Sequence, residues 1–200
     1  MSLSRPSSTE LRCSRGIAGL RRWLRLALVF VFTLPGAGFA TYGAEADDAL
    51  VVEYQLKAAF VYNFAKFVEW PVDGGADAGA FTLCVVGELP YRVMQQALAG
   101  KRIRGLPLVI RSLNAPTGVD GCQLLFVGAG AGHLSFAPVG AVPVLTVGES
   151  GDFLRSGGMI NLVRVDNRLR FEIARSTGER AGLKFSSQLL KLATPAGDAP

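Results

Sequence analysis

Four short apolar runs, each about as long as one β-strand, recur between residues 81 and 148. They cover residues 81–87, 106–113, 122–128 and 143–148. Continuous apolar runs are typical of strands that are buried on both faces, as in parallel sheets covered by helices. The helical or loop segments between the runs supply the crossovers that parallel strands need. The pattern predicts an α/β fold with a mostly parallel sheet flanked by helices.

The sequence after residue 150 predicts a different closing motif. Residues 159–165 and 168–173 read as two strands joined by the pair Asp166-Asn167, which favours an antiparallel hairpin. Residues 180–193 carry apolar side chains at helical spacing and predict a terminal helix, and residues 196–200 predict a disordered tail. We therefore expect a C-terminal β-hairpin and a terminal helix beside the parallel strands.

A long amphipathic helix is expected over residues 47–70, where apolar residues recur at helical spacing before Pro71. A shorter helix is expected over residues 90–99, with Pro90 in its first turn. The long helix has too many aromatic residues for a single stripe. Some of them must face a second partner, which is either the sheet or another chain.

The positive charge of the chain is concentrated at its start. The formal net charge is +5, but residues 1–44 contain six arginines and one glutamate, so the remainder carries equal numbers of acidic and basic residues. Non-specific nucleic-acid binding is driven by a basic face that releases counterions. A neutral remainder offers no such face, so we do not expect nucleic acid as a partner.

The first 44 residues have the build of a cleaved signal peptide. An arginine-rich start precedes the apolar stretch 26–34, and small residues follow up to Ala40 and Ala44. The uninterrupted apolar stretch has about nine residues, whereas a membrane-spanning helix needs roughly 20. We therefore expect a signal peptide over residues 1–44, one domain over residues 45–195, and a protein that works outside the cytoplasm.

Removing the leader leaves two cysteines, Cys84 and Cys122. An even count in an oxidising compartment favours a disulfide, and the alternative is two buried free thiols on strands. A bridge between them would stabilise the fold by roughly 3–4 kcal/mol in the chain-entropy model. The sequence has no Cys-x-x-Cys motif, so the bridge would be structural.

Candidate catalytic residues are sparse. The histidine His133 lies in a glycine-rich loop (128–133) that lacks the spacing of a dinucleotide-binding motif, and no Gly-x-Ser-x-Gly motif is present. Glu149 and Asp152 follow a predicted strand, and helix capping is the expected role of Asp152. We predict no enzyme activity, cofactor or metal. Two alternatives stay open: a small-molecule pocket formed by the loops 87–88, 128–133 and 148–152, and a hydrolase that uses His133 and Glu149.

Four blocks of the sequence resemble the YfiR-like family of periplasmic proteins. The blocks are residues 54–71, 81–87, 157–173 and 181–193. The resemblance implies a periplasmic repressor, often a homodimer, that binds an inner-membrane diguanylate cyclase of the YfiN type. It also implies lower cyclic di-GMP and less biofilm, with relief of repression by an outer-membrane lipoprotein of the YfiB type. Ala174 departs from the asparagine common in the family, and the chain lacks the second cysteine pair of some members.

A repressor needs a surface with apolar anchors and a few charges. We expect two partner-binding patches, one at the aromatic end of the long helix and one on the hairpin. The first contains Phe64, Phe67 and Trp70, and the second contains Met159, Ile160, Phe171 and Glu172. The alternative for the aromatic residues is packing in the core, and for Glu172 it is a solvated strand charge.

Overall fold

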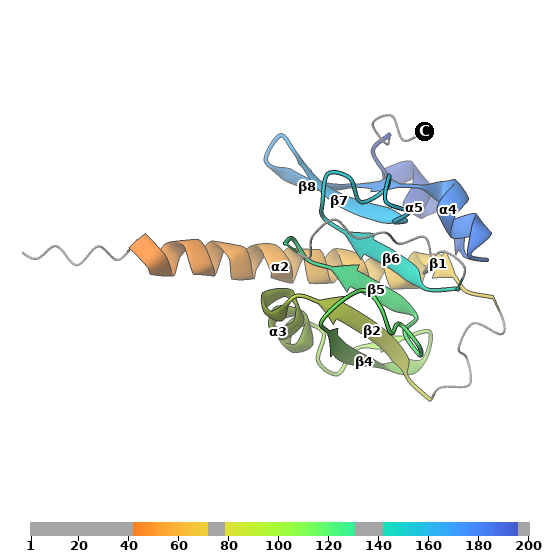
Figure 1. Ribbon diagram of the computed structural model, residues 1–200, viewed down its shortest axis with the longest axis horizontal. Coiled ribbons are helices and arrows are strands. Elements are labelled where there is room, and N and C mark those ends of the chain that lie inside the picture. The colour runs from red at the N-terminus through yellow and green to blue at the C-terminus, as the bar shows by residue number, and fades with distance from the viewer. Residues whose placement is uncertain (1–41, 72–78, 131–141, 196–200) are drawn as a thin grey trace, which may run out of the picture. The chain divides into compact units, whose positions relative to one another are not determined.

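A seven-stranded sheet is the largest element of the computed structural model, which describes residues 42–71, 79–130 and 142–195 (Figure 1). Its order is β3-β4-β2-β5-β6-β7-β8. The strands are β2 Phe81–Val86, β3 Arg102–Ile103, β4 Leu106–Leu113, β5 Leu124–Val127, β6 Leu145–Gly148, β7 Ile160–Val165 and β8 Arg168–Ile173. Neighbours from β4 to β7 are parallel, and β3 and β8 add antiparallel edges. The predicted mostly parallel α/β fold is confirmed.

The signal peptide predicted over residues 1–44 falls almost entirely outside the described residues. The same holds for the predicted tail over residues 196–200 and for His133.

The hairpin formed by β7 and β8 is the antiparallel closing motif that the sequence predicts. Asp166 and Asn167 join the two strands with φ values of 47° and 57°. Two-residue hairpin turns of type I′ require positive φ at both central residues, and Asn and Asp tolerate this conformation better than other side chains. The local chemistry of these two residues therefore sets the register of the hairpin.

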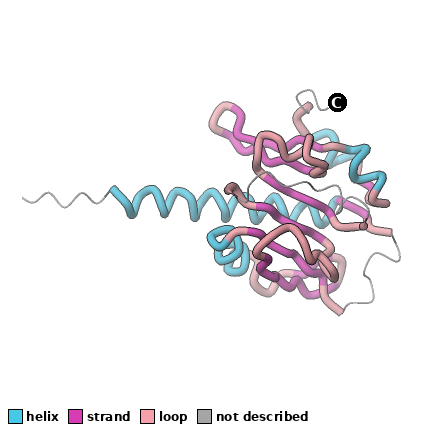
Figure 2. The backbone as a smooth tube through the Cα atoms, in the orientation of Figure 1, coloured by secondary structure: helices cyan, strands magenta, loops and turns pink. Residues whose placement is uncertain are grey.

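The long helix α2 covers residues Tyr42–Phe67; its C-terminal part lies along the sheet, and its first turns extend beyond the strands (Figures 1 and 2). The predicted extension to Trp70 is wrong, because β1 (Val68–Glu69) pairs with β9 (Lys184–Phe185) in a separate two-stranded sheet. The N–H of Ser186 donates to the carbonyl of Phe67 at 3.0 Å, so the helix end is tied to this small sheet.

The prediction of one helix over residues 180–193 is also wrong. The segment contains α4 (Arg175–Arg180), β9 and α5 (Ser187–Leu192). Gly182 has φ +78° and interrupts the helical path, and Leu183 is buried. Ser186 caps α5 by accepting a hydrogen bond from the N–H of Leu189 at 3.2 Å. The apolar residues in this segment come from the turn after α4, from β9 and from α5.

The described helices pack mainly against one face of the sheet. A large core cluster joins α2 residues such as Phe64 with α3 (Glu88–Ala97), with alternate residues of the strands, and with Leu183 and Leu189. A smaller cluster on the other face contains Cys84, Leu125 and Phe153, and among the described residues it is covered by loops. The described helices therefore cover one face of the sheet more fully than the other.

The predicted helix over residues 90–99 corresponds to α3, with Pro90 in its first turn.

Strand β4 differs from the prediction of burial on both faces. None of its residues is fully buried, and Val109 is 47% exposed. Among the described strands, only the two-residue β3 pairs with its outer side, so β4 lies close to the edge of the sheet.

Candidate functional site

A buried carboxylate, that of Glu149, lies directly after β6 at the carboxyl end of the parallel strands. Its side chain is 6% exposed. Oε1 accepts hydrogen bonds from the hydroxyl of Tyr54 at 2.9 Å and from the N–H of Ala129 at 2.7 Å. Oε2 forms an ion pair with Lys57, whose side chain is also 6% exposed. Both carboxylate oxygens therefore have donors, as a buried charge requires.

The charge cluster continues from Lys57 towards the hairpin. Lys57 Nζ lies 2.6 Å from Glu53 Oε1, one helical turn away, and 4.5 Å from the centre of the Tyr54 ring. The other oxygen of Glu53 pairs with Arg164 on β7, and Arg164 donates to Asn167 Oδ1 at 3.0 Å. One chain of polar contacts thus connects β6, α2 and the hairpin.

The cluster perturbs two of its members. The hydrogen bond from Lys57 lowers the pKa of the Glu53 carboxyl, and the charges of Lys57 and Arg164 act in the same direction. Burial raises the pKa of the Tyr54 hydroxyl, and the neighbouring Glu149 carboxylate raises it further. Tyr54 stays protonated and donates to Glu149, while Glu53 stays ionised.

The cluster lies beside the point where the order in which strands are added to the sheet reverses. β4 is parallel to β2 on one side, and β5 is parallel to β2 on the other. Ligands of open α/β sheets commonly bind above such a point. Here a Cβ at Gly128 would lie 2.7 Å from Pro90 Cγ and 3.6 Å from Glu149 Oε1. Pro90 and Glu149 therefore already occupy the space beside Gly128, and residues 131–133 of the expected pocket lie outside the described residues.

Glu149 faces no open site in this arrangement. Lys57, the Tyr54 hydroxyl and the N–H of Ala129 occupy its two carboxylate oxygens, so the carboxylate is poorly placed to contact a substrate. Asp152 lies in a run of turns over residues 151–157. In the ranges 42–71, 79–130 and 142–195, no group of three or more His, Cys, Asp or Glu side chains could hold a metal ion.

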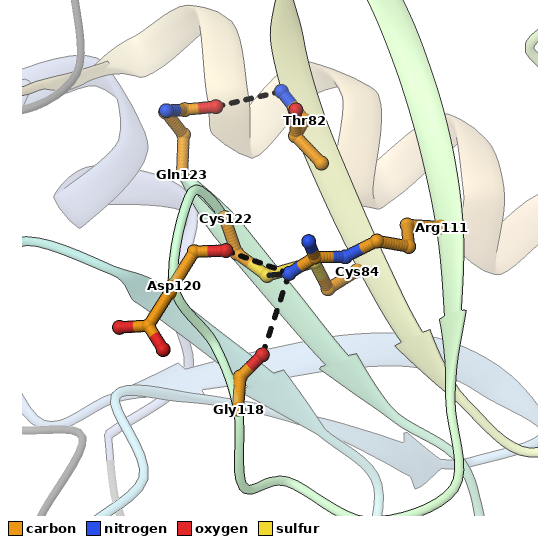
Figure 3. The surroundings of a disulfide bond; sticks show 7 residues. All are labelled: Thr82, Cys84, Arg111, Gly118, Asp120, Cys122 and Gln123. Atoms are coloured by element: carbon orange, nitrogen blue, oxygen red, sulfur yellow. Dashed lines mark hydrogen bonds between the residues drawn. A yellow bond between two sulfur atoms is a disulfide. The ribbon is translucent and has the colours of Figure 1, made fainter.

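The disulfide predicted between Cys84 and Cys122 is present in the structure. It joins β2 to the residue that precedes Gln123 and β5, with the two Cα atoms 5.9 Å apart (Figure 3). Arg111 on β4 lies over it: Nη2 is 3.0 Å from Cys122 Sγ and donates to the carbonyl of Asp120 at 2.8 Å. The bridge and Arg111 together fasten the loop before β5 to two neighbouring strands.

Most residues of the two expected partner patches lie in the core. Phe64, Met159 and Ile160 are at most 1% exposed, and Phe171 and Trp70 are also buried. The rings of Phe64 and Phe171 pack with centroids 4.9 Å apart. These five side chains offer no surface to a partner in this conformation.

Both the indole N–H and the ring of Trp70 have partners inside the protein. Its Nε1 donates to the carbonyl of Gln123 at 3.2 Å, and its ring packs edge-on against Phe81. Of the two patches, Phe67 is 37% exposed and Glu172 is partly exposed. Only these two residues remain available to a partner, and their role as partner contacts stays a proposal.

A further apolar surface lies on the first turns of α2. Leu50, Val52 and Leu56 are 45%, 63% and 49% exposed. With Leu169 of β8 they line a groove of about 550 Å³ between α2 and the hairpin. Leu50 and Leu56 fit the helical spacing that predicts a buried face. The spacing indicates that these residues share an apolar face, but it does not show whether that face is buried or exposed. The sequence feature that pointed to a second partner was the excess of aromatic residues over a single stripe, whereas the residues exposed here are aliphatic.

These features define a disulfide-stapled α/β domain whose buried charges are satisfied internally and whose long helix exposes apolar side chains. The profile of the YfiR/HmsC-like family matches residues 54–194, and the chain belongs to this family. The family is regulatory rather than catalytic and periplasmic. No curated protein matches the chain. Among the described helices, none has the length and apolar character required to cross a membrane.

Proposed function

We propose that this chain is a periplasmic regulator that binds an inner-membrane diguanylate cyclase and represses it, which lowers cyclic di-GMP and limits biofilm formation. The observation that carries the proposal is the family match over residues 54–194, which spans the sheet from α2 to the last bridge at Thr194. The predicted signal peptide over residues 1–44 would deliver the domain to the compartment where the cyclase exposes its periplasmic part.

The chemistry of the buried cluster supports binding over catalysis. Glu149 is engaged with Tyr54, Lys57 and the backbone of Ala129, so it holds elements together instead of facing an open site. A repressor needs a rigid surface, and the Cys84–Cys122 bridge and this cluster both restrict motion between the elements that carry the surface.

On the hairpin, the exposed tip replaces the buried residues as the candidate contact. Val165 is 42% exposed, and Arg168 and Arg170 are exposed beside it on β8. With the exposed Asp166 next to Val165, the tip combines one apolar side chain with two arginines and one aspartate, a net positive charge that suits an acidic partner surface with an apolar centre. We assign the cyclase contact to this tip and to Phe67 and Glu172.

Affinity capture tests the proposal. The full chain with a C-terminal tag is expressed in its own host, cross-linked in living cells and purified from solubilised membranes. We expect a membrane protein with a diguanylate cyclase domain in the captured fraction, and several-fold less of it with Val165→Asp or Phe67→Asp.

Val109→Asp is the matched control, because Val109 is 47% exposed but lies on β4, near the opposite edge of the sheet. It should capture as much cyclase as the unchanged chain. Capture that contains no cyclase, or that falls equally with all three variants, would contradict the proposal.

A further inference from the structure

The even balance of charge in the chain after residue 44 conceals an uneven distribution. Residues 89–119 contain five basic residues and no aspartate or glutamate. All five are exposed, and they are Arg92, Lys101, Arg102, Arg104 and Arg111. Like charges that gather on one part of a surface create a local potential that the net charge of the chain does not report. The domain therefore has a basic region although its acidic and basic residues are equal in number.

Three of these cations are gathered at one edge of the sheet by the short hairpin of β3 and β4. Lys101 precedes β3, Arg102 begins it, and Arg104 lies in the turn to β4. Lys66 of α2 lies close by, because its Nζ is 5.5 Å from the centre of the Tyr62 ring and the Tyr62 hydroxyl donates to the carbonyl of Arg102 at 3.0 Å. We call Lys66, Lys101, Arg102 and Arg104 the basic edge.

The charges of the basic edge are not neutralised within the part of the chain that the structure describes. None of its four side chains forms an ion pair with another described residue. Glu69, which follows Lys66 by three residues, lies opposite Lys184 in the β1–β9 register. The four positive charges therefore remain available to an anion from outside the domain.

Arg104 occupies a backbone position that usually takes another kind of residue. Arg104 and Gly105 have φ values of 53° and 82°, and two-residue hairpin turns with positive φ at both positions favour Asn-Gly. The guanidinium of Arg104 lies over the ring of Trp70, with Cζ 6.0 Å from the ring centre, and the side chain stays exposed. An arginine at an uncommon positive φ indicates a role for its charge rather than for the turn.

The composition of the basic edge indicates the kind of anion that it suits. Stable protein interfaces have an apolar centre from which charged residues are depleted. Here the ring of Trp70 is only 8% exposed, whereas the cations around it point outward. Exposed Lys and Arg side chains suit a surface with many exchangeable phosphates, such as the headgroups of anionic phospholipids.

We propose that the basic edge docks the domain electrostatically on a membrane surface that contains anionic phospholipid. The predicted export would place the domain beside such membranes and away from nucleic acid. The hairpin tip that we assign to the cyclase lies next to β8, at the opposite end of the strand order from β3. The domain can therefore contact lipid at one edge and a membrane protein at the other. The inference extends beyond the proposed function, because docking on lipid requires no cyclase.

Co-sedimentation with lipid vesicles tests the docking. The exported chain is purified from the periplasm and mixed with vesicles of phosphatidylglycerol and phosphatidylcholine, or of phosphatidylcholine alone. We expect binding only to the vesicles that contain phosphatidylglycerol, and we expect added salt to weaken it, because salt screens exposed charges. Equal binding to both kinds of vesicle, or binding to neither, would overturn the inference.

A pair of matched variants tests the position of the lipid contact. Arg102→Gln should raise the dissociation constant for the anionic vesicles roughly fivefold, because each cation near an anionic membrane surface adds a similar share of the attraction. Arg155→Gln removes an exposed arginine from the turns after β6, outside the basic edge, and should leave the constant unchanged. Equal weakening by the two variants would show that only the total charge matters and would contradict the assignment to this edge.

Arg104→Asn separates docking from stability. Asparagine is favoured at this position of the turn, so the melting temperature should be unchanged or higher. Vesicle binding should nevertheless fall roughly fivefold, as with Arg102→Gln. Unchanged vesicle binding by Arg104→Asn would remove this residue from the contact and contradict the role inferred from its backbone.

A second outcome would replace the lipid with a protein. If the chain does not bind vesicles, but Arg102→Gln lowers the capture of a water-soluble periplasmic protein in cross-linked cells, then the basic edge binds that protein and the inference is wrong. Since the vesicle assay contains no cyclase, its failure leaves the proposed repression untouched.

Discussion

The hydroxyl of Tyr54 donates a hydrogen bond to the carboxylate of Glu149 at 2.9 Å, which joins α2 to the end of β6 across 95 residues of sequence. Lys57, one turn further along α2, pairs with the other oxygen of the same carboxylate. A buried ion pair of this kind contributes less to net stability than to positioning, because the desolvation of both charges offsets most of their attraction. We interpret the cluster as the device that fixes how α2 lies on the sheet.

Replacing Lys57 tests this interpretation. Lys57→Met leaves Glu149 and Glu53 without the cation that lies between them, so the free energy of unfolding should fall by about 3–5 kcal/mol. Lys66→Met removes an exposed lysine from the same helix and should change it by less than about 0.5 kcal/mol. Urea denaturation of both variants provides the measurement, and equal effects would show that Lys57 has no special role.

The lowered pKa of Glu53 predicts an acid-dependent stability. A carboxyl group whose pKa is lower in the folded than in the unfolded state contributes stability above its unfolded pKa and loses it as the pH falls through the folded value. The wild type should therefore be more stable than Glu53→Gln at pH 7, and the difference should shrink steadily below about pH 4.5. Thermal unfolding of both proteins between pH 7 and pH 3 measures it. A difference that does not change with pH would contradict the assignment.

The disulfide should contribute to stability without affecting the fold. Cys84→Ala combined with Cys122→Ala should lower the free energy of unfolding by roughly 3–4 kcal/mol, because the unfolded chain regains the freedom of the loop between the two residues. Urea denaturation with and without a reductant checks this. The reductant should bring the wild type to the level of the double variant and leave the double variant unchanged. If it destabilises both proteins equally, the bridge is not the cause.

Gly148 and Gly151 provide a matched pair for the packing on the loop-covered face. A Cβ at Gly148 would lie 2.2 Å from the ring of Phe153, which is 2% exposed, whereas a Cβ at Gly151 would meet no atom within 4 Å. Gly148→Ala should therefore lower the free energy of unfolding by about 1–3 kcal/mol. Gly151→Ala should be neutral or slightly stabilising. Thermal melts that rank the two variants in the opposite order would show that Phe153 does not pack as described.

Local sequence chemistry predicted the elements whose formation depends on neighbouring residues. The apolar runs gave strands β2, β5 and β6, and Asp166-Asn167 gave the hairpin turn. The prediction of one C-terminal helix was wrong because its apolar residues are divided among the turn after α4, β9 and α5, and Gly182 breaks the helical path between them.

The candidate site could not be predicted because its members are far apart in the sequence. Lys57 and Glu149 are 92 residues apart, and no local pattern connects them. The burial of most residues in the expected partner patches could not be predicted for another reason. Helical spacing shows that α2 is apolar on several sides, but only the position of the sheet decides that Phe64 is buried and Leu56 is exposed.

Cyclic di-GMP in living cells provides the most direct test of the central claim, which is repression from outside the cytoplasm. In a strain that lacks this gene, mass spectrometry should show a higher level of cyclic di-GMP than in the parent. Expression of the full chain should restore the parental level, whereas residues 45–200 without the predicted signal peptide should not. An unchanged level on deletion, or full rescue by the leaderless chain, would contradict the account.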